Sequence, residues 1–279
     1  MKQTLKKLRD ALNPLYGQRE TEAIIRLIFH HLKGWNLTDM LIHQEDGLSD
    51  FVRQQIDEIL VRLLRHEPIQ YIVGEARFHG MDLKIKPGVL IPRPETDELV
   101  DIIVDENKGR EDLKVLDLCT GSGCIAIALA RNLPFSKVTA IDFSDEAIEV
   151  AEENSRDLKV KINIVKADIF NWVPDGNFDI IVSNPPYIKD SEALTMEKNV
   201  LDYEPHEALF VRDENPLVFY SRIADIAAES LNPGGRLYFE INPLTAKDLK
   251  ELISGKGFSD VQLLRDSSGK LRFLSAGKK

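Results

Sequence analysis

The chain has 279 residues, of which 43% are hydrophobic and 29% are charged, and its 16 glycines and 13 prolines are scattered along it. This length suggests about two domains, and the composition excludes collagen, a coiled coil and bulk disorder. Lys and Arg number 36 against 46 Asp and Glu, a formal net charge of −10. Because phosphate contacts usually demand a basic stripe, this balance argues against nucleic acid as the main partner.

The sequence shows no feature of a membrane or secreted protein. Its longest apolar runs span only a few residues, such as 180–182, whereas a bilayer requires roughly 20. Met1–Lys7 leads into polar sequence without the apolar core of a signal peptide. The two cysteines, Cys119 and Cys124, fit neither a disulfide framework nor a zinc pattern. We therefore expect a cytoplasmic protein without membrane contacts or a metal site, and we expect a monomer.

Residues 1–74 show apolar side chains at helical spacing and predict a small domain of three or four short helices. Two stripes carry this prediction: Ala23, Ile24, Leu27, Ile28, His31 and Leu32, and then Val52, Ile56, Ile59, Leu60 and Leu63. Gly34 follows the first stripe as a helix stop, and Ser49 precedes the second as a candidate N-cap. Such a domain is either a structural bundle or a module that recognises a partner protein.

The pattern changes in residues 75–96. Residues 76–85 alternate around a glycine, which predicts a β-hairpin. Three prolines then occur within residues 87–94, and because proline restricts its neighbours we expect residues 87–96 to be extended and stiff. A linker rarely needs to be both stiff and apolar, so we expect this segment to line a site.

Residues 97–279 form the third predicted region, in which strands and helices alternate from Lys114 onward. This order predicts an α/β fold with a mostly parallel sheet covered by helices on both faces and closed by a C-terminal pair of strands. The predicted strands span residues 114–120, 138–143, 162–168, 178–184, 236–241, 261–265 and 271–275, and the helices span 124–132, 145–157, 216–231 and 245–254.

Three successive strands end in residues suited to a nucleoside. The first runs into Gly121-Ser122-Gly123, where glycine lets the backbone approach a ligand and a helix begins with partial positive charge. The second ends in Asp142, placed to accept ribose hydroxyls, and the third ends in Asp168, placed to reach an adenine edge. Gly121, Gly123 and Ala126 also satisfy the dinucleotide pattern, so at this point a nicotinamide or flavin enzyme remains an alternative.

The fourth strand ends in Asn184-Pro185-Pro186-Tyr187. Here the chain resembles class I S-adenosylmethionine-dependent methyltransferases that act on planar nitrogen. A delocalised amide or amino nitrogen is a poor nucleophile, and the Asn184 side-chain oxygen and the Pro185 carbonyl can each accept one of its N–H bonds. Tyr187 can stack on the flat group, so we expect Asn184, Pro185 and Tyr187 to be catalytic.

A more specific resemblance covers essentially the whole chain. Residues 90–96, the turn at 117–123, residues 184–188 and residues 203–209 occur in the order and spacing of the peptide chain release factor N5-glutamine methyltransferases, the PrmC/HemK family. The resemblance implies a Rossmann-like methyltransferase sheet, S-adenosylmethionine as cofactor and S-adenosylhomocysteine as product. It also implies a substrate, the glutamine of the Gly-Gly-Gln loop of class I release factors, with residues 1–74 docking the release factor.

The family pattern implies roles for individual residues. It places substrate contacts on Asn184, Pro185, Pro186 and Tyr187, and cofactor contacts on Cys119, Thr120, Gly121, Ser122, Gly123, Asp142, Asp168, Ile169 and Asn184. Cys119 stands where many relatives have glycine, so a positive φ there would be strained. Ile169 stands where some relatives have an aromatic residue, which would change the packing of adenine.

Two alternatives remain at the level of sequence. A nucleic-acid adenine-N6 or cytosine-N4 methyltransferase would use the same Asn-Pro-Pro-Tyr segment, although the acidic charge and the lack of a recognisable target-recognition domain argue against it. A non-catalytic or dinucleotide-binding module could also retain this fold.

Overall fold

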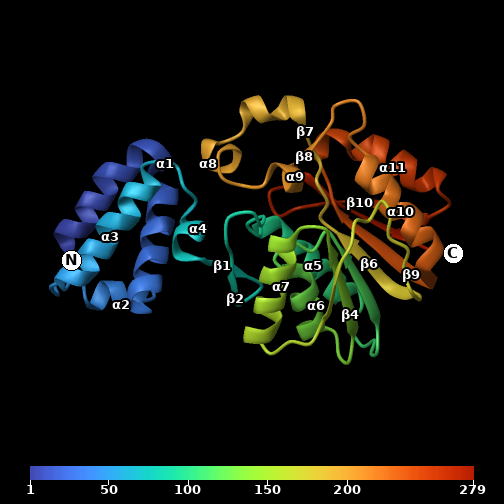
Figure 1. Cartoon of the computed structure of the whole chain (residues 1–279), viewed down its shortest axis with the longest axis horizontal. Coiled ribbons are helices and arrows are strands. Elements are labelled where there is room, and N and C mark those ends of the chain that lie inside the picture. Colours follow the sequence, from blue (N-terminus) through green and yellow to red (C-terminus); the bar gives the residue numbers. More distant parts are fainter. The chain divides into compact units, whose positions relative to one another are not determined.

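The computed structural model describes residues 1–279, and the chain divides into two compact units. One unit comprises Met1–Glu75 with Glu197–Tyr203, and the other comprises Ala76–Met196 with Glu204–Lys279. Figure 1 shows helices alone in the first unit and a sheet with helices in the second.

The first unit is helical, as predicted, but its first helix is much longer than expected. Its helices are α1 (Lys2–Lys33), α2 (Leu37–Ile42), α3 (Asp50–Leu63), α4 (Ile69–Val73) and the short α8 (Lys198–Leu201). Helix α1 continues through a kink at Gly17, whose φ of 72° and ψ of 164° are not helical. Gly34 ends α1 in the left-handed conformation, and the Ser49 hydroxyl accepts the Val52 amide, so both predicted helix ends are confirmed.

The two predicted apolar stripes differ in accuracy. Every residue of the α3 stripe is buried. In α1 the buried face is rotated from the predicted one, because Ile25 and Phe29 are fully buried whereas His31 is exposed. Apolar residues fill positions 23–25 and 27–29 in succession, so periodicity alone did not decide which edge packs.

In the second unit the predicted hairpin is confirmed as β1 (Glu75–Phe78) and β2 (Met81–Lys84). The expectation that residues 87–96 are all extended is wrong, because Pro94 begins helix α5 (Pro94–Glu106). Proline is favoured at the first position of a helix, where its missing N–H has no partner to lose. The acidic first turn and the buried Leu99, Val100 and Ile103 are signals that the sequence already carried.

The predicted Rossmann-like sheet is confirmed, with seven strands in the order β10-β11-β9-β6-β3-β4-β5. All neighbours are parallel except that β11 runs antiparallel to both β9 and β10. The strands are β3 (Lys114–Leu118), β4 (Lys137–Asp142), β5 (Asn163–Lys166), β6 (Phe178–Ser183), β9 (Leu231–Glu240), β10 (Ser259–Arg265) and β11 (Leu271–Gly277). The strand order reverses between β3 and β6, which is where sheets of this kind bind ligands.

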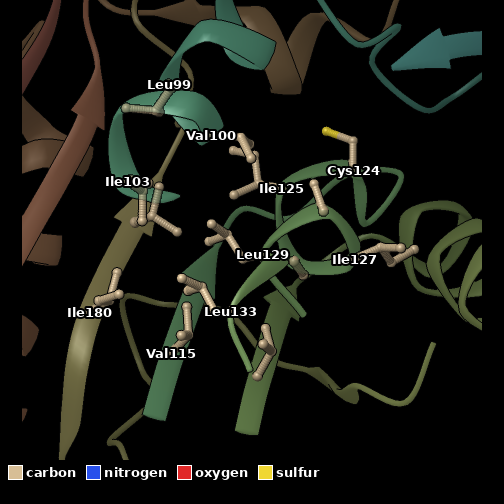
Figure 2. Close-up of a cluster of buried hydrophobic side chains, with 14 of the residues drawn as sticks. Leu99, Val100, Ile103, Val115, Cys124, Ile125, Ile127, Leu129, Leu133 and Ile180 are labelled. Atoms are coloured by element: carbon tan, nitrogen blue, oxygen red, sulfur yellow. The ribbon is translucent and has the colours of Figure 1, made fainter. Parts of the chain in front are cut away.

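Helices cover both faces of the sheet (Figure 1). Helices α5, α6 (Cys124–Asn132) and α7 (Asp145–Asp157) lie on one face, and α10 (Val218–Ser230) and α11 (Ala246–Gly255) lie on the other. Figure 2 shows the first core, in which side chains of α5 and α6 meet those of β3 and β6. A second core lies on the other face, where residues of α10 and α11 pack against the sheet. The two apolar cores hold the sheet rigid beneath its carboxyl edge.

Short elements complete the second unit near that edge. They are β7 (Ile188–Lys189), β8 (Phe210–Val211), α9 (His206–Leu209) and the 3-10 turns at Asp190–Thr195 and Pro243–Thr245. No helix in the chain combines the length and apolar character needed to cross a membrane.

Leu129 tests the α6 core, where it is fully buried (Figure 2). We expect Leu129→Ala to lower the free energy of unfolding by about 2–5 kcal/mol, because the lost contacts leave a cavity. Leu194→Ala is the control, since Leu194 is 94% exposed and should change stability by less than about 0.5 kcal/mol. Urea unfolding measures both, and equal effects would contradict the described packing.

Candidate functional site

A cavity lies at the carboxyl ends of β3, β4, β5 and β6. Together with its open mouth it spans about 930 Å³. Nine residues that the sequence singled out line this one cavity: Cys119, Thr120, Gly121, Ser122, Asp142, Asp168, Ile169, Asn184 and Pro186. Residues 88–90, 92, 93 and 96 line it as well, which agrees with the expectation that the proline-rich segment borders a site.

The turn after β3 has the conformation that glycine favours. Gly121 has a φ of 56° and Gly123 a φ of 79°. Gly123 does not line the cavity, and a Cβ there would lie 3.2 Å from the Ala151 Cβ on α7, so it serves the packing of the turn. Asn154, also on α7, donates from its side chain to the Ser122 carbonyl over 3.0 Å and so ties the turn to that helix.

Cys119 adopts the positive φ that its position made unfavourable. Its φ is 62°, a left-handed conformation that is strained for a residue with a side chain. Burial strongly raises the pKa of its thiol, which makes the neutral, unreactive form dominant. Cys119 therefore acts as a small apolar wall of the cavity.

Asp142 is buried at the end of β4 and organises the backbone around it. Its two carboxylate oxygens accept the Gly121 amide over 2.8 Å and the Ser144 amide over 3.1 Å. Burial raises the pKa of Asp142, and these backbone hydrogen bonds oppose the shift. Each oxygen retains a further lone pair, so the carboxylate can also accept hydroxyl groups from a ligand.

Asp168 and Ile169 form the wall that follows β5. The Phe170 amide and the Asn171 side chain hold the Asp168 carboxylate over 3.0 and 2.8 Å. Arg222 on α10 donates to the Ile169 carbonyl over 2.8 Å and so fixes the loop. Phe219 also lines this part of the cavity, so a flat apolar group would meet one polar edge, Asp168, between apolar walls.

Asn184 lines the cavity directly after β6, as predicted. Its side-chain Nδ2 donates to the Thr96 hydroxyl over 3.3 Å. The amide is therefore held from one side, and its oxygen remains available as an acceptor.

Pro185 and Tyr187, two of the three residues predicted to be catalytic, do not line the cavity, although Pro186 does. The Tyr187 ring packs against the second core and its hydroxyl donates to the buried Glu240 over 2.9 Å. In this arrangement the Tyr187 hydroxyl belongs to a buried polar network.

Sequence reasoning missed Glu240, the last residue of β9. Its carboxylate is 1% exposed and also accepts the Thr96 hydroxyl over 2.6 Å. Burial raises the pKa of Glu240, whereas the hydrogen bonds from Thr96 and Tyr187 and the charge of Arg272 oppose the shift. The alternation of β9 alone would have assigned position 240 to a strand end without revealing these partners.

A second buried carboxylate, that of Glu204, links two of the segments that carry the family resemblance, residues 90–96 and 203–209. Glu204 accepts the Ile91 amide over 3.2 Å and pairs with the Arg93 guanidinium over 2.5 Å. This side chain thereby holds the loop of residues 90–93 against the cavity.

Near the C-terminus, Asp266 accepts the Lys270 amide and Gly269 has a φ of 84°, so these two residues shape the β10–β11 turn.

Asp117 lies fully buried beneath the turn, where the Thr120 hydroxyl donates to it over 2.6 Å. Burial raises the pKa of Asp117 from 3.8 to about 7.

No group of three or more His, Cys, Asp or Glu side chains is arranged to hold a metal ion.

The pKa of Asp117 predicts a pH dependence of stability. Between pH 4 and pH 7 the folded chain retains a proton that the unfolded chain releases, so the free energy of unfolding falls as pH rises. Relative to Asp117→Asn, the parent should lose on the order of 2–3 kcal/mol between pH 5 and pH 8. Urea unfolding at both pH values measures this, with the surface variant Glu251→Gln as control; parallel curves for Asp117→Asn and the parent would contradict it.

The chain is similar in sequence to known proteins over nearly its whole length. Residues 3–74 match the PrmC N-terminal domain, and residues 81–203 match the methyltransferase small domain. Among curated proteins, the release factor glutamine methyltransferase of Bacteroides thetaiotaomicron is 44% identical over 97% of this chain and 98% of its own length. That of Flavobacterium psychrophilum is 41% identical over 95% of this chain and 94% of its own length.

Solved structures support the fold. A Thermus thermophilus 16S rRNA methyltransferase in complex with AdoMet and guanosine superposes with a TM-score of 0.55 and 21% identity, over 74% of this chain and 50% of that one. A Pyrococcus furiosus methyltransferase gives a TM-score of 0.54 and 23% identity, over 80% of this chain and 98% of that one. Since the curated relatives match along nearly their full lengths, the chain belongs to the release factor glutamine methyltransferase family.

Proposed function

We propose that this protein transfers the methyl group of S-adenosylmethionine to the side-chain amide nitrogen, N5, of the glutamine in the Gly-Gly-Gln loop of class I peptide chain release factors. The observation that carries the proposal is Asn184, an amide held at the wall of a cavity that also contains the glycine turn and Asp142. The family of the chain supports the choice of substrate.

The residues of the cavity fit the cofactor chemically. Asp142 offers acceptors for two ribose hydroxyls, Asp168 offers a polar edge for adenine, and Gly121 leaves room for close approach of the backbone. Ile169 and Phe219 supply apolar walls for the base. When bound, S-adenosylmethionine supplies an electrophilic methyl group on a sulfonium.

The Asn184 oxygen then has a defined task. A glutamine amide nitrogen is a poor nucleophile because its lone pair is delocalised into the carbonyl group. Asn184 Oδ1, which lines the cavity, would accept one of its N–H bonds, hold this nitrogen and stabilise it as it becomes tetrahedral. Holding the reacting atoms in place can contribute roughly 7–11 kcal/mol.

No His or Lys lines the cavity. This suits methylation of an amide nitrogen, because the nitrogen first carries the new methyl group, both of its protons and a positive charge. This cation is strongly acidic and gives up one proton to water. A dedicated general base is not required.

We also propose that residues 1–74 form a domain that docks the release factor, that residues 75–96 link it, and that residues 97–279 carry the chemistry. In support of this role, several large apolar side chains are exposed in the helical unit. They are Leu37, Leu41, Phe51 and Val61, with exposed fractions of 51% or more.

Transfer of tritium-labelled methyl from S-adenosylmethionine to a purified class I release factor tests the function. We expect label on the Gly-Gly-Gln peptide and none on a matched release factor whose loop reads Gly-Gly-Glu, because the latter has no amide nitrogen. Label on DNA or RNA instead would favour the nucleic-acid alternative. Binding of NADH without affinity for S-adenosylmethionine would favour a dinucleotide-binding module.

Asn184→Ala separates chemistry from cofactor binding. We expect kcat to fall by about 100–1000-fold, by analogy with the loss of one polar group that stabilises a transition state. Affinity for S-adenosylhomocysteine, measured by calorimetry, should remain near that of the parent. A large loss of cofactor affinity would show that Asn184 has been assigned the wrong role.

Asp142→Ala should show the opposite pattern. We expect its affinity for S-adenosylhomocysteine to fall roughly 10–100-fold, since hydrogen bonds to a charged group contribute about 1.5–3 kcal/mol. At saturating cofactor kcat should be much less affected. Unchanged affinity would exclude Asp142 as the ribose ligand.

A further inference from the structure

We propose that Glu240 and Thr96 are positioning residues that set the polarity of the Asn184 amide, so that its oxygen, and not its NH₂ group, faces the cavity. This inference rests on the proposed function and extends it to two residues that do not belong to the Asn-Pro-Pro-Tyr segment. Both act through Asn184, although Thr96 also lines the cavity.

The starting point is the buried carboxylate of Glu240. One of its oxygens accepts the Thr96 hydroxyl over 2.6 Å, and the other accepts the Tyr187 hydroxyl over 2.9 Å. Each hydroxyl donates its hydrogen to a different oxygen of this carboxylate. Burial raises the pKa of Glu240, and the two hydrogen bonds and the charge of Arg272 oppose this shift.

The direction of the Thr96 hydroxyl determines the next contact. Since its only hydrogen is used on Glu240, its oxygen can act only as an acceptor toward Asn184. The amide atom that faces Thr96 must then be a donor, which is Nδ2, at 3.3 Å. The planar amide consequently directs Oδ1 away from Thr96, as an acceptor for a substrate N–H.

The fold supplies this chain of contacts from three separate elements. Glu240 ends β9 and Asn184 follows β6, and the parallel register of these strands pairs Ser183 with Phe239, so the next residues lie at the same level. Thr96 comes from the first turn of α5. The main chain of Glu240 is held in turn by the Tyr220 hydroxyl over 2.9 Å.

The wrong polarity would be costly to catalysis. If Nδ2 faced the cavity, a donor would meet the N–H of the substrate amide, and the favourable contact would become repulsive. Glu240→Gln creates this possibility, because its NH₂ group can donate to Thr96 and free the Thr96 hydroxyl to donate to Asn184. Thr96→Val removes the contact and leaves the amide free to turn.

Kinetics on the release factor substrate tests the inference. We expect Thr96→Val and Glu240→Gln to lower kcat by about 100-fold, as misplacement of a catalytic group by about 1 Å does. Affinity for S-adenosylhomocysteine should be unchanged, and Thr96→Ser, which keeps the hydroxyl, should restore most of kcat. Glu106→Gln is the matched control, because Glu106 also accepts a tyrosine hydroxyl of β9, that of Tyr238 over 2.8 Å, but does not line the cavity.

A double-mutant cycle distinguishes positioning from a general structural effect. If Thr96 acts through Asn184, Thr96→Val should cause no further loss of kcat in an Asn184→Ala background. Full additivity, or parental kcat in Thr96→Val and Glu240→Gln, would overturn the inference while leaving the proposed function intact. Absence of methyl transfer by the parent would instead reject the proposed function.

Nuclear magnetic resonance gives a readout independent of turnover. In protein labelled with nitrogen-15, one of the two Asn184 side-chain protons should shift upfield in Thr96→Val and keep its parental position in Glu106→Gln. An Asn184 signal that is unaffected by Thr96→Val would show that the hydrogen bond does not hold the amide.

Discussion

The site depends on the position of β6 between β3 and β9. Parallel pairing on both sides aligns the carboxyl ends of these three strands, so the glycine turn, Asn184 and Glu240 arise at one level of one edge. The strand order reverses between β3 and β6, and no crossover helix covers the opening there. A one-residue slip of β6 would direct Asn184 to the opposite face of the sheet and separate it from Thr96.

The free energy gained from burying the two apolar cores offsets the cost of burying carboxylates at this edge. Carboxylates at 117, 142, 204 and 240 are all buried, and each accepts at least one hydrogen bond from the turn, loop or helix beside it. Burying such groups is unfavourable unless they are paired, so each one imposes a definite geometry on its partners. The rigid sheet beneath supplies the stability that these groups cost, and they in turn hold the walls of the cavity.

The same edge also contains a residue with a strained backbone. Cys119 takes a left-handed conformation between β3 and the glycine turn, although glycine would adopt it with less strain. The adjoining contacts, from Asp142 to Gly121 and from Asn154 to Ser122, hold the turn that requires it. The cavity wall is therefore maintained by its surroundings and not by the intrinsic preference of its own residues.

Much of the site could be predicted because its signals are local. Composition and alternation identify the strands that end in the glycine turn, in Asp142 and in Asn184. Parallel pairing then brings these strand ends together. The buried edge of α1 and the start of α5 were misjudged for a local reason too, since Ile25 and Phe29 extend an already apolar face and Pro94 is equally compatible with a loop and with a first helical turn.

Local pattern was thus enough to establish a mostly parallel α/β sheet, a nucleoside-type cavity at its carboxyl edge and Asn184 as the amide within it. The partners of that amide became visible only through packing, since Thr96 and Glu240 lie 88 and 56 positions from it in the chain. Hydrogen bonds between such distant side chains depend on strand register and helix placement, which no window of the sequence contains. For the same reason only the folded chain placed the Tyr187 hydroxyl on Glu240.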